Sequence, residues 1–207
     1  MTTAGTGLRV IGGQYKGRRL KTPDWPGLRP TSDRLRETLF NILTPWIAGA
    51  RVVDGYAGTG ALGIEALSRG AAAVTFIEHD RRAAGLIDAN VKGCGIEGGY
   101  TIHCADVGAA LDALPAADAF DLILLDPPYD SDNVSAALDA AARRLTTDGL
   151  VVLERASRRE PADAAGLHRT RDVKSGDSTL TFFRRMDSAS GHPDANPDPG
   201  RATPGGE

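Results

Sequence analysis

The chain has 207 residues, of which 41% are hydrophobic and 25% charged, with a formal net charge of -3; these values are typical of one globular domain with short appendages. It has no run of about 18 uncharged apolar residues and no secretion signal at its N-terminus, which excludes a membrane span and predicts a cytoplasmic protein. Cys94, Cys104 and four scattered histidines lack the spacing of a zinc site or a disulfide framework, so no metal is expected.

Basic residues are concentrated near the N-terminus. Residues 1 to 36 contain eight Lys or Arg and two Asp, although the whole chain is slightly acidic. Residues 8 to 21 read as two short strands around a glycine-rich turn, which predicts a β-hairpin. A basic hairpin beside a binding face can follow a phosphate backbone, although surface Lys and Arg more often only aid solubility. The candidate RNA-contacting residues are Arg9, Lys16, Arg18, Arg19 and Lys21.

The segment after the hairpin predicts a helix that packs on the main domain. Pro26 and Pro30 favour an extended chain, and Ser32 is a suitable N-cap. Four apolar residues then recur at helical spacing and form one face: Leu35, Leu39, Ile42 and Leu43.

From residue 50 onward, short apolar runs alternate with helical stretches. The runs that predict strands cover residues 50–54, 72–78, 100–106, 120–126 and 150–154. Helices are predicted at 61–70, 80–93 and 131–145, with a further short one after residue 106. Near-continuous apolar strands between helices indicate a parallel sheet that is covered on both faces. Residues 167–185 predict an antiparallel hairpin turning at 174–178, so the fold class is a doubly wound α/β domain with an antiparallel edge.

These patterns divide the chain into a hairpin extension (1–28), a main domain (29–186) and a tail (187–207). The tail contains four prolines, four glycines and few side chains that can be buried. Such a segment cannot offset the entropy of ordering, so the tail is predicted to be disordered.

The ends of the predicted strands carry the candidate binding residues, because ligands of an open doubly wound sheet bind outside the carboxyl ends of its strands. The first strand leads into Gly58, Gly60 and Gly63, a GxGxxG pattern that lets a ligand approach the backbone. The second ends at Glu78, 20 residues after Gly58, where an acid can bind ribose hydroxyls. The third ends at Asp106, which can accept a hydrogen bond from an adenine amine. Together they predict bound adenosine, although helix packing, a surface acid and a helix cap are structural alternatives.

The fourth strand runs into Asp126-Pro127-Pro128-Tyr129. In such a sheet this strand neighbours the first across the switch point, which places Asp126 beside the glycine loop. The prolines hold the segment extended and lack amide donors, so the Asp126 carboxylate and the Pro127 carbonyl are expected to project outward unpaired. Two adjacent acceptors suit a planar amino group, and Tyr129 can stack on the ring that bears it. The alternative is a loop opener that caps the next helix.

This arrangement predicts transfer of a methyl group to an exocyclic amine. Such an amine is a poor nucleophile because its lone pair is delocalised into the ring. Hydrogen bonds to its protons draw the lone pair back toward nitrogen and aim it at an electrophilic methyl. Catalysis then consists of positioning and charge placement, and it needs no covalent enzyme intermediate.

The motifs together resemble the S-adenosylmethionine-dependent amino-methyltransferases, which have a Rossmann-like class I methyltransferase fold. The fuller set, LRVIGGQYKGRRL, RPTSDRLRETLFNIL, GALGIEALSRGA and LLDPPYD, resembles the RsmD family, which methylates N2 of one guanine in bacterial small-subunit (16S) ribosomal RNA. The resemblance covers roughly residues 8 to 185. It implies S-adenosylmethionine as the cofactor, with S-adenosylhomocysteine as the product.

The resemblance also implies roles for individual residues. The loop after the first strand holds the methionine part of the cofactor, Glu78 the ribose and Asp106 the adenine. The cofactor-binding residues are then Pro30, Thr31, Asp54, Tyr56, Ala57, Gly58, Gly60, Glu78 and Asp106, and the residues that receive the guanine are Asp126, Pro127, Pro128 and Tyr129. The family more often reads DLFAGSG, so Gly55 and Tyr56 replace a bulky apolar residue and a Phe in this chain.

The expected substrate is small-subunit rRNA within an assembled or assembling 30S particle, and the protein is expected to act as a monomer. Three alternatives stay open. An adenine-N6 methyltransferase acting on DNA or RNA uses the same tetrapeptide in almost the same way. A nicotinamide-dependent oxidoreductase shares the glycine loop and Glu78 but does not need the tetrapeptide. A non-enzymatic RNA-binding protein can keep the fold without the reaction.

Overall fold

A computed structural model describes residues 7–25, 33–115, 117–128, 131, 133–160 and 164–186. Within these residues the strands are β1 (Arg51–Gly55), β2 (Ala73–Ile77), β3 (Tyr100–His103), β4 (Phe120–Leu125), β5 (Leu145–Ala156), β6 (Leu167–Ser175) and β7 (Ser178–Arg185). The helices are α1 (Asp33–Ile47), α2 (Ala61–Ser68), α3 (Arg81–Gly93), α4 (Val107–Ala113) and α5 (Val134–Arg144). The predicted tail, 187–207, lies outside the described residues.

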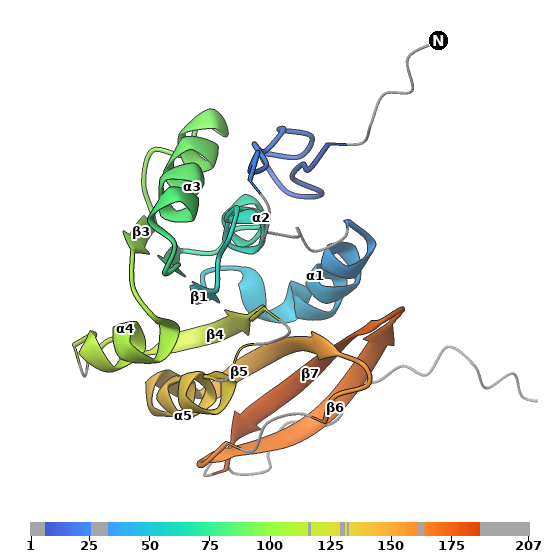
Figure 1. Ribbon diagram of the computed structural model, residues 1–207, viewed down its shortest axis with the longest axis vertical. Helices are drawn as coiled ribbons and strands as arrows, with labels where there is room; N and C mark the ends of the chain where they lie inside the picture. The colour runs from blue at the N-terminus through green and yellow to red at the C-terminus, as the bar shows by residue number, and fades with distance from the viewer. Residues whose placement is uncertain are drawn as a thin grey trace, which may run out of the picture.

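The strands form one sheet in the order β3-β2-β1-β4-β5-β7-β6 (Figure 1). The first five strands in chain order run parallel, whereas β7 is antiparallel to both β5 and β6. The predicted doubly wound sheet with an antiparallel C-terminal edge is therefore confirmed. Strand order reverses between β1 and β4, so the crevice outside their carboxyl ends is the expected ligand site.

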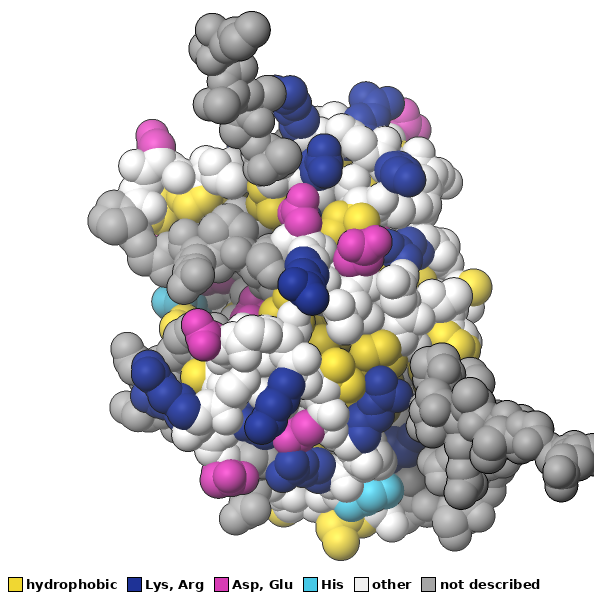
Figure 2. Space-filling model, turned by 90° about the vertical axis from the view of Figure 1, so that its right-hand side faces the viewer, with side chains coloured by type: hydrophobic (Ala, Val, Ile, Leu, Met, Phe, Trp, Pro, Cys, Tyr) yellow, Lys and Arg dark blue, Asp and Glu magenta, His cyan; other side chains and the backbone are white. Residues whose placement is uncertain are grey.

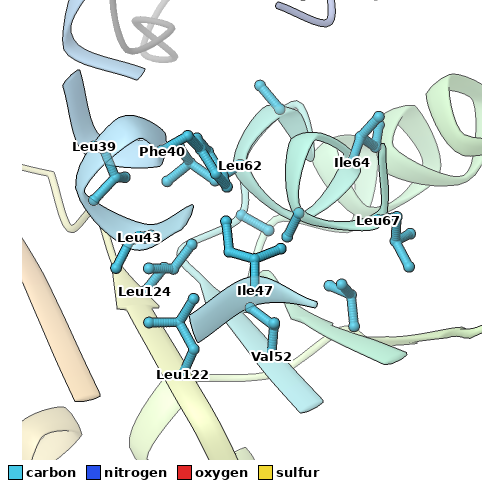
Figure 3. Packing of buried hydrophobic residues seen from close by; sticks show 14 of the residues in the cluster. Leu39, Phe40, Leu43, Ile47, Val52, Leu62, Ile64, Leu67, Leu122 and Leu124 are labelled. Carbon is cyan, nitrogen blue, oxygen red and sulfur yellow. The ribbon is translucent and has the colours of Figure 1, made fainter. Parts of the chain in front are cut away.

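Two hydrophobic clusters lie on opposite faces of the sheet. Buried residues of α1, α2 and α3 pack with one set of alternating strand residues, and those of α4 and α5 pack with the other set. Figure 3 shows side chains of α1 directed toward α2, β1 and β4; the labelled residues are Leu39, Phe40, Leu43, Ile47, Val52, Leu62, Ile64, Leu67, Leu122 and Leu124. The predicted apolar face of α1 is confirmed, with Leu35, Leu39 and Leu43 buried and Ile42 half-buried.

The N-terminal hairpin is a tight loop with one antiparallel bridge, Arg9↔Arg19, in place of two extended strands. The reason lies in its partners. Backbone N–H groups of Ile11 and Gly12 donate to the buried Glu65 carboxylate of α2, each at 2.7 Å, and so are not available to a neighbouring strand. Leu8, Val10 and Leu20 point into the main core. The extension is thus packed against the main domain through both apolar and polar contacts.

Several element boundaries differ from those predicted. β3 ends at His103 and not at residue 106, because Asp106 caps α4: its Oδ1 accepts a hydrogen bond from the N–H of Ala109 at 3.1 Å. β5 begins at Leu145, before the predicted residue 150, and a register shift between Phe120 and Leu122 accommodates the extra length against β4. Among the residues that the structure describes, no helix has both the length and the apolar character needed to cross a membrane.

Leu43 lies fully buried between α1 and the sheet, so we predict that Leu43→Ala lowers the free energy of unfolding by about 2 to 5 kcal/mol. Urea unfolding followed by circular dichroism measures the change. Asn41→Ala, on the exposed face of the same helix, is the control and is expected to change stability by less than about 0.5 kcal/mol. Equal effects of the two substitutions would contradict this packing.

Candidate active site

The loop between β1 and α2 has the backbone shape that its glycines allow. Gly60 adopts φ 77°, a left-handed conformation that a residue with a Cβ rarely takes. At Gly63, a Cβ would lie 2.3 Å from the Phe76 ring of β2, so glycine is needed for α2 to approach the sheet. The Ala57 N–H donates to the carbonyl of Ile77 at 3.1 Å and ties the loop to the end of β2. The loop is therefore preformed at the switch point.

Glu78, immediately after β2, is buried beside this loop. Its Oε2 accepts a hydrogen bond from the N–H of Gly58 at 2.9 Å, and its Oε1 accepts one from the N–H of Asp80 at 2.8 Å. The Nδ1 of His79 also lies 3.1 Å from Oε1, so Oε2 is the oxygen with a further lone pair for another donor. Glu78 is thus not a surface acid but braces the glycine loop, whereas Asp80 is the N-cap of α3, as the structural alternative held.

Asp54 lies beneath the loop and is 1% exposed. Its Oδ2 accepts a hydrogen bond from the N–H of Gly63 at 2.7 Å. Burial raises the pKa of Asp54 well above its ordinary value, the Gly63 N–H opposes that shift, and the Asp126 and Glu78 carboxylates add to it. Asp54, near the end of β1, and the carboxylates that follow β2 and β4 therefore act on one another, and a positively charged ligand beside them would favour the ionised form of Asp54.

Asp106 is exposed and caps α4. The structure thus realises the helix-cap alternative, and a carboxylate oxygen that accepts one N–H can still accept a second donor. Tyr56 packs beside the second hydrophobic cluster, and burial raises the pKa of its phenol. The Asp106 carboxylate also raises the pKa of Tyr56. Asp106, which comes after β3, is therefore close to Tyr56, which comes after β1.

Asp126 follows β4 and extends its pairing with β1, since its N–H donates to the carbonyl of Gly55 at 3.3 Å. This places Asp126 next to the glycine loop, as predicted. The expectation that its carboxylate projects unpaired is wrong, because Asp126 interacts with other residues of the protein and its carboxylate raises the pKa of Glu154 on β5. The register explains the contact: Leu125 of β4 pairs with Leu153 of β5, so the next residue of each strand points to the same side.

A cavity of about 170 Å³ lies beside the tetrapeptide, bordered by Pro127 and Pro128 on one side and by Leu153 and Glu154 of β5 on the other. α5 begins after Asn133, whose side chain makes no capping hydrogen bond. The N-cap residue of α5 is thus Asn133 and not Asp126. Three of the predicted site residues, Pro30, Thr31 and Tyr129, lie outside the described residues.

The predicted RNA-contacting residues are all exposed on the hairpin: Arg9, Lys16, Arg18, Arg19 and Lys21. Figure 2 shows the side of the molecule that is on the right in Figure 1, with Lys and Arg side chains on its upper part, where the hairpin lies, and others on its lower part. One of these residues, Arg9, also lies 3.8 Å from the Asp33 carboxylate. Such an exposed contact contributes little to stability, so Arg9 stays free to exchange partners.

Two buried polar residues near the predicted site, Asn90 and Glu154, were not predicted. Asn90 of α3, 2% exposed, donates to the carbonyls of Lys21 (3.1 Å) and Thr59 (2.9 Å) and accepts from the Lys21 N–H at 2.7 Å. It therefore links the basic hairpin to the glycine loop. Glu154 was missed as well, although it closes a predicted strand with an acid, the same signal that identified Glu78.

Comparison with known proteins gives the family. The chain matches the family described as "Conserved hypothetical protein 95" over residues 8–184. It belongs to this family. The RsmD resemblance is confirmed by a relative named "Ribosomal RNA small subunit methyltransferase D" from Escherichia coli (strain K12), which is 64% identical over 74 residues. That match covers 36% of this chain and 37% of the relative, so little more than a third of the relative is spanned.

Two further relatives span more of the chain. "Putative rRNA methyltransferase YlbH" from Bacillus subtilis (strain 168) is 37% identical over 150 residues, covering 71% of this chain and 82% of that protein. The solved structure of "Putative methyltransferase yhhF from Escherichia coli" superposes with a TM-score of 0.74 at 30% identity, covering 86% and 97% of the two chains. The Rossmann-like methyltransferase fold is thereby confirmed.

Two residues of the loop depart from the pattern that is commoner in the family. A Cβ at Gly55 would lie 2.7 Å from a methyl group of Leu125 and 3.2 Å from one of Val107, so a bulky residue would require repacking of both. Tyr56 is the one non-glycine residue with positive φ, at 61°, among the described residues. Such a conformation costs on the order of 1 to 3 kcal/mol and is found mainly at functional sites.

We predict that Asp54→Asn makes the folded chain more stable than wild type at pH 7. The raised pKa means that the folded state holds the Asp54 proton more tightly than the unfolded state, whose ordinary value is 3.8. This contribution to stability is present below pH 3.8 and is lost as pH rises through the raised pKa. Asparagine keeps the acceptor for Gly63 and removes the charge.

Urea unfolding at several pH values tests this, with the advantage of the variant expected to disappear below about pH 4. Asp88→Asn, which removes a partly exposed carboxylate paired with Lys92 at 2.7 Å, is the control and should change stability by less than about 1 kcal/mol. An Asp54→Asn chain that is less stable than wild type at pH 7 would contradict the assignment.

Proposed function

We propose that the chain transfers a methyl group from S-adenosylmethionine to the exocyclic N2 of a guanine in small-subunit rRNA. The observation that carries this proposal is the position of Asp126-Pro127-Pro128 at the end of β4, joined to β1 by the Asp126 N–H and adjacent to the preformed glycine loop. Family membership and the names of the rRNA methyltransferase relatives support the same class of reaction.

The described residues fit S-adenosylmethionine. When bound, it supplies an electrophilic methyl group on a sulfonium. The glycine loop leaves its backbone open to a ligand, Glu78 offers a buried carboxylate to the ribose hydroxyls, and Asp54 offers negative charge beneath the loop. In the proposal, the remaining cofactor contacts come from Tyr56, Ala57, Asp106, Pro30 and Thr31.

Asp126 then receives the substrate amine. Its carboxylate is an acceptor fixed by strand pairing on its N-terminal side and by two prolines, which lack N–H donors, on its C-terminal side. Hydrogen bonds from the N2 protons to Asp126 and the Pro127 carbonyl orient the nitrogen lone pair, and the catalytic contribution is positioning with charge placement. The guanine ring is proposed to stack on Tyr129.

The neighbouring cavity supports a single base as the group that enters. Its volume of about 170 Å³ is below the roughly 300 to 1,000 Å³ of pockets that hold drug-sized ligands. Ribose and phosphates would therefore stay outside, as in enzymes that take a base out of its stack. The basic hairpin would follow the phosphates, with the main domain at residues 29–186 performing the reaction on the 30S particle as a monomer.

We predict that Asp126→Ala lowers kcat for methyl transfer by about 100- to 1,000-fold while S-adenosylmethionine binds nearly as tightly, because Asp126 contacts the amine and not the cofactor. Asp88→Ala, which removes a carboxylate on α3, is the matched control. Radiolabel transfer to purified 30S subunits and to naked 16S rRNA measures activity.

Digestion of the methylated RNA to nucleosides should yield N2-methylguanosine. N6-methyladenosine would instead support the adenine alternative, and binding of NADH without binding of S-adenosylmethionine would support the oxidoreductase.

Replacing Arg18 and Arg19 together by alanine is expected to weaken RNA binding and to leave cofactor binding intact. If the five basic hairpin residues contact phosphates, the slope of log affinity against log salt is about -3.5 for single-stranded RNA, and the double variant reduces it by about 1.4. Arg143→Ala, an exposed arginine of α5 paired with Asp112, serves as the control. RNA affinity at low salt that is unchanged in the double variant would refute the hairpin as an RNA contact.

A further inference from the structure

Glu154 is a buried acid that the proposed reaction does not yet use. It lies near the carboxyl end of β5 and is 8% exposed. Because Leu125 and Leu153 are partners in the parallel pairing of β4 with β5, Asp126 and Glu154 follow side by side. The pairing directs their side chains to the same side of the sheet, and the Asp126 carboxylate raises the pKa of Glu154. Two neighbouring carboxyl groups repel each other when both are ionised, so a proton on one of them favours their approach.

The Glu154 carboxyl group is also held from β7. The Ser178 hydroxyl, from the first residue of β7, donates to Oε1 at 2.9 Å. A carboxyl group whose one oxygen accepts from serine and whose other side meets Asp126 has little freedom to rotate. Glu154 is therefore held from β7 on one side and contacts Asp126 of β4 on the other.

The charges around Asp126 and Glu154 favour the state in which the two carboxyl groups hold one proton over the state in which both are ionised. Asp126 faces Glu154 from the end of β4, and behind Asp126 lies the buried Asp54 carboxylate, which it influences. The nearest arginine in the chain, Arg155, directs its guanidinium to Thr181 and Asp172, at 2.8 and 2.7 Å. Burial, followed by the Asp126 charge, raises the pKa of Glu154 to about 8.

Arg159 and Glu160 are the remaining charged groups that border the adjoining cavity, one of each sign. They lie in the segment after β5, and Glu160 is exposed. Their opposite charges offset each other at the cavity edge.

We infer that Glu154 is a positioning residue, which shares one proton with Asp126 and so holds the Asp126 carboxylate in the orientation that accepts the substrate amine. This inference rests on the proposed function, because the amine is the group that Asp126 would receive. The protonated Glu154 donates to one lone pair of Asp126 and leaves the others free. Asp126 keeps its negative charge, which strengthens its hydrogen bonds to an amine.

The shared proton predicts how activity depends on pH. Ionisation of Glu154 puts a second negative charge beside Asp126, and repulsion turns the two carboxylates apart. Methyl transfer is therefore expected to decline as pH rises through about 8. The free energy of unfolding is expected to fall over the same pH range. The pKa of Glu154 in the folded state lies above the ordinary value of 4.5, so its contribution to stability is fully present below pH 4.5 and is lost as pH rises to about 8.

The test compares Glu154→Gln with Glu154→Ala. Glutamine keeps both hydrogen bonds, since its amide N–H donates to Asp126 and its carbonyl accepts from Ser178. It should retain kcat within a small factor and lose the alkaline decline. Alanine should lower kcat by about 10- to 100-fold, with the KM for S-adenosylmethionine unchanged. Glu160→Gln, which removes a charge from the same cavity, is the matched control and should keep the wild-type pH profile.

A second readout does not need the reaction. Carbon-13 NMR of glutamate side-chain carboxyls in the cofactor-free protein should show one group that titrates near pH 8 and disappears in Glu154→Gln. In Asp126→Asn its pKa should fall toward the ordinary value. The inference is overturned if Glu154 titrates near 4.5 in the wild type, or if Glu154→Ala keeps wild-type kcat and pH profile.

The two proposals fail differently. If the wild-type protein transfers no methyl group to rRNA but the carboxyl still titrates near 8, the proposed function fails and the proton-sharing pair survives. If methyl transfer to guanine is observed and no carboxyl titrates there, the pair fails alone. Should Glu154→Ala not fold, judged by circular dichroism, the pH profile of Glu154→Gln and the NMR titration decide.

Discussion

The pairing of β4 with β1 on one side and β5 on the other is the constraint on which the site depends. Because parallel strands end at the same edge of a sheet, this pairing gathers Asp54, Asp126 and Glu154 at the switch point, on one face. Gathering acids in a buried place is unfavourable unless hydrogen bonds or a proton compensate. The Gly63 N–H and the Ser178 hydroxyl provide part of that compensation, and the proton that we propose Asp126 and Glu154 share would provide the rest.

The same edge is connected to the basic hairpin by buried polar contacts. Glu65 accepts two backbone N–H groups of the hairpin and also pairs with Arg69 at 2.7 Å, and Asn90 bonds to both the hairpin and the glycine loop. Buried polar groups that are fully paired fix the relative placement of the elements they join. These paired groups therefore hold the hairpin against the main domain, beside the glycine loop.

Much of this could be predicted from local pattern. Apolar runs marked the parallel strands, and Gly60, Gly63, Glu78 and Asp126 were identified because strand-to-helix turns and strand-end acids have local signatures. What failed depends on tertiary contacts. The predicted unpaired state of Asp126 was wrong because Glu154 comes from a strand 28 residues later in the chain, and only the register of β4 against β5 brings the two together.

Other differences have the same origin. The hairpin strands are shortened to a single bridge because the Ile11 and Gly12 amides bond to Glu65 of α2, a partner that no hairpin pattern contains. Asn90 occurs in an ordinary amphipathic helix, and its role depends on which loops reach it. Asp106 fits both a helix cap and an adenine contact by sequence, and the structure places it as the cap.

The most direct measurement is a crystal structure of the chain with S-adenosylhomocysteine and a short guanosine-containing RNA. We predict that the product sulfur lies by the Gly58–Gly60 loop and that guanine N2 lies within about 3 Å of an Asp126 carboxylate oxygen, a normal hydrogen-bond length. A cofactor bound away from that loop, or a base whose amine turns away from Asp126, would contradict the central role of the strand-end carboxylates.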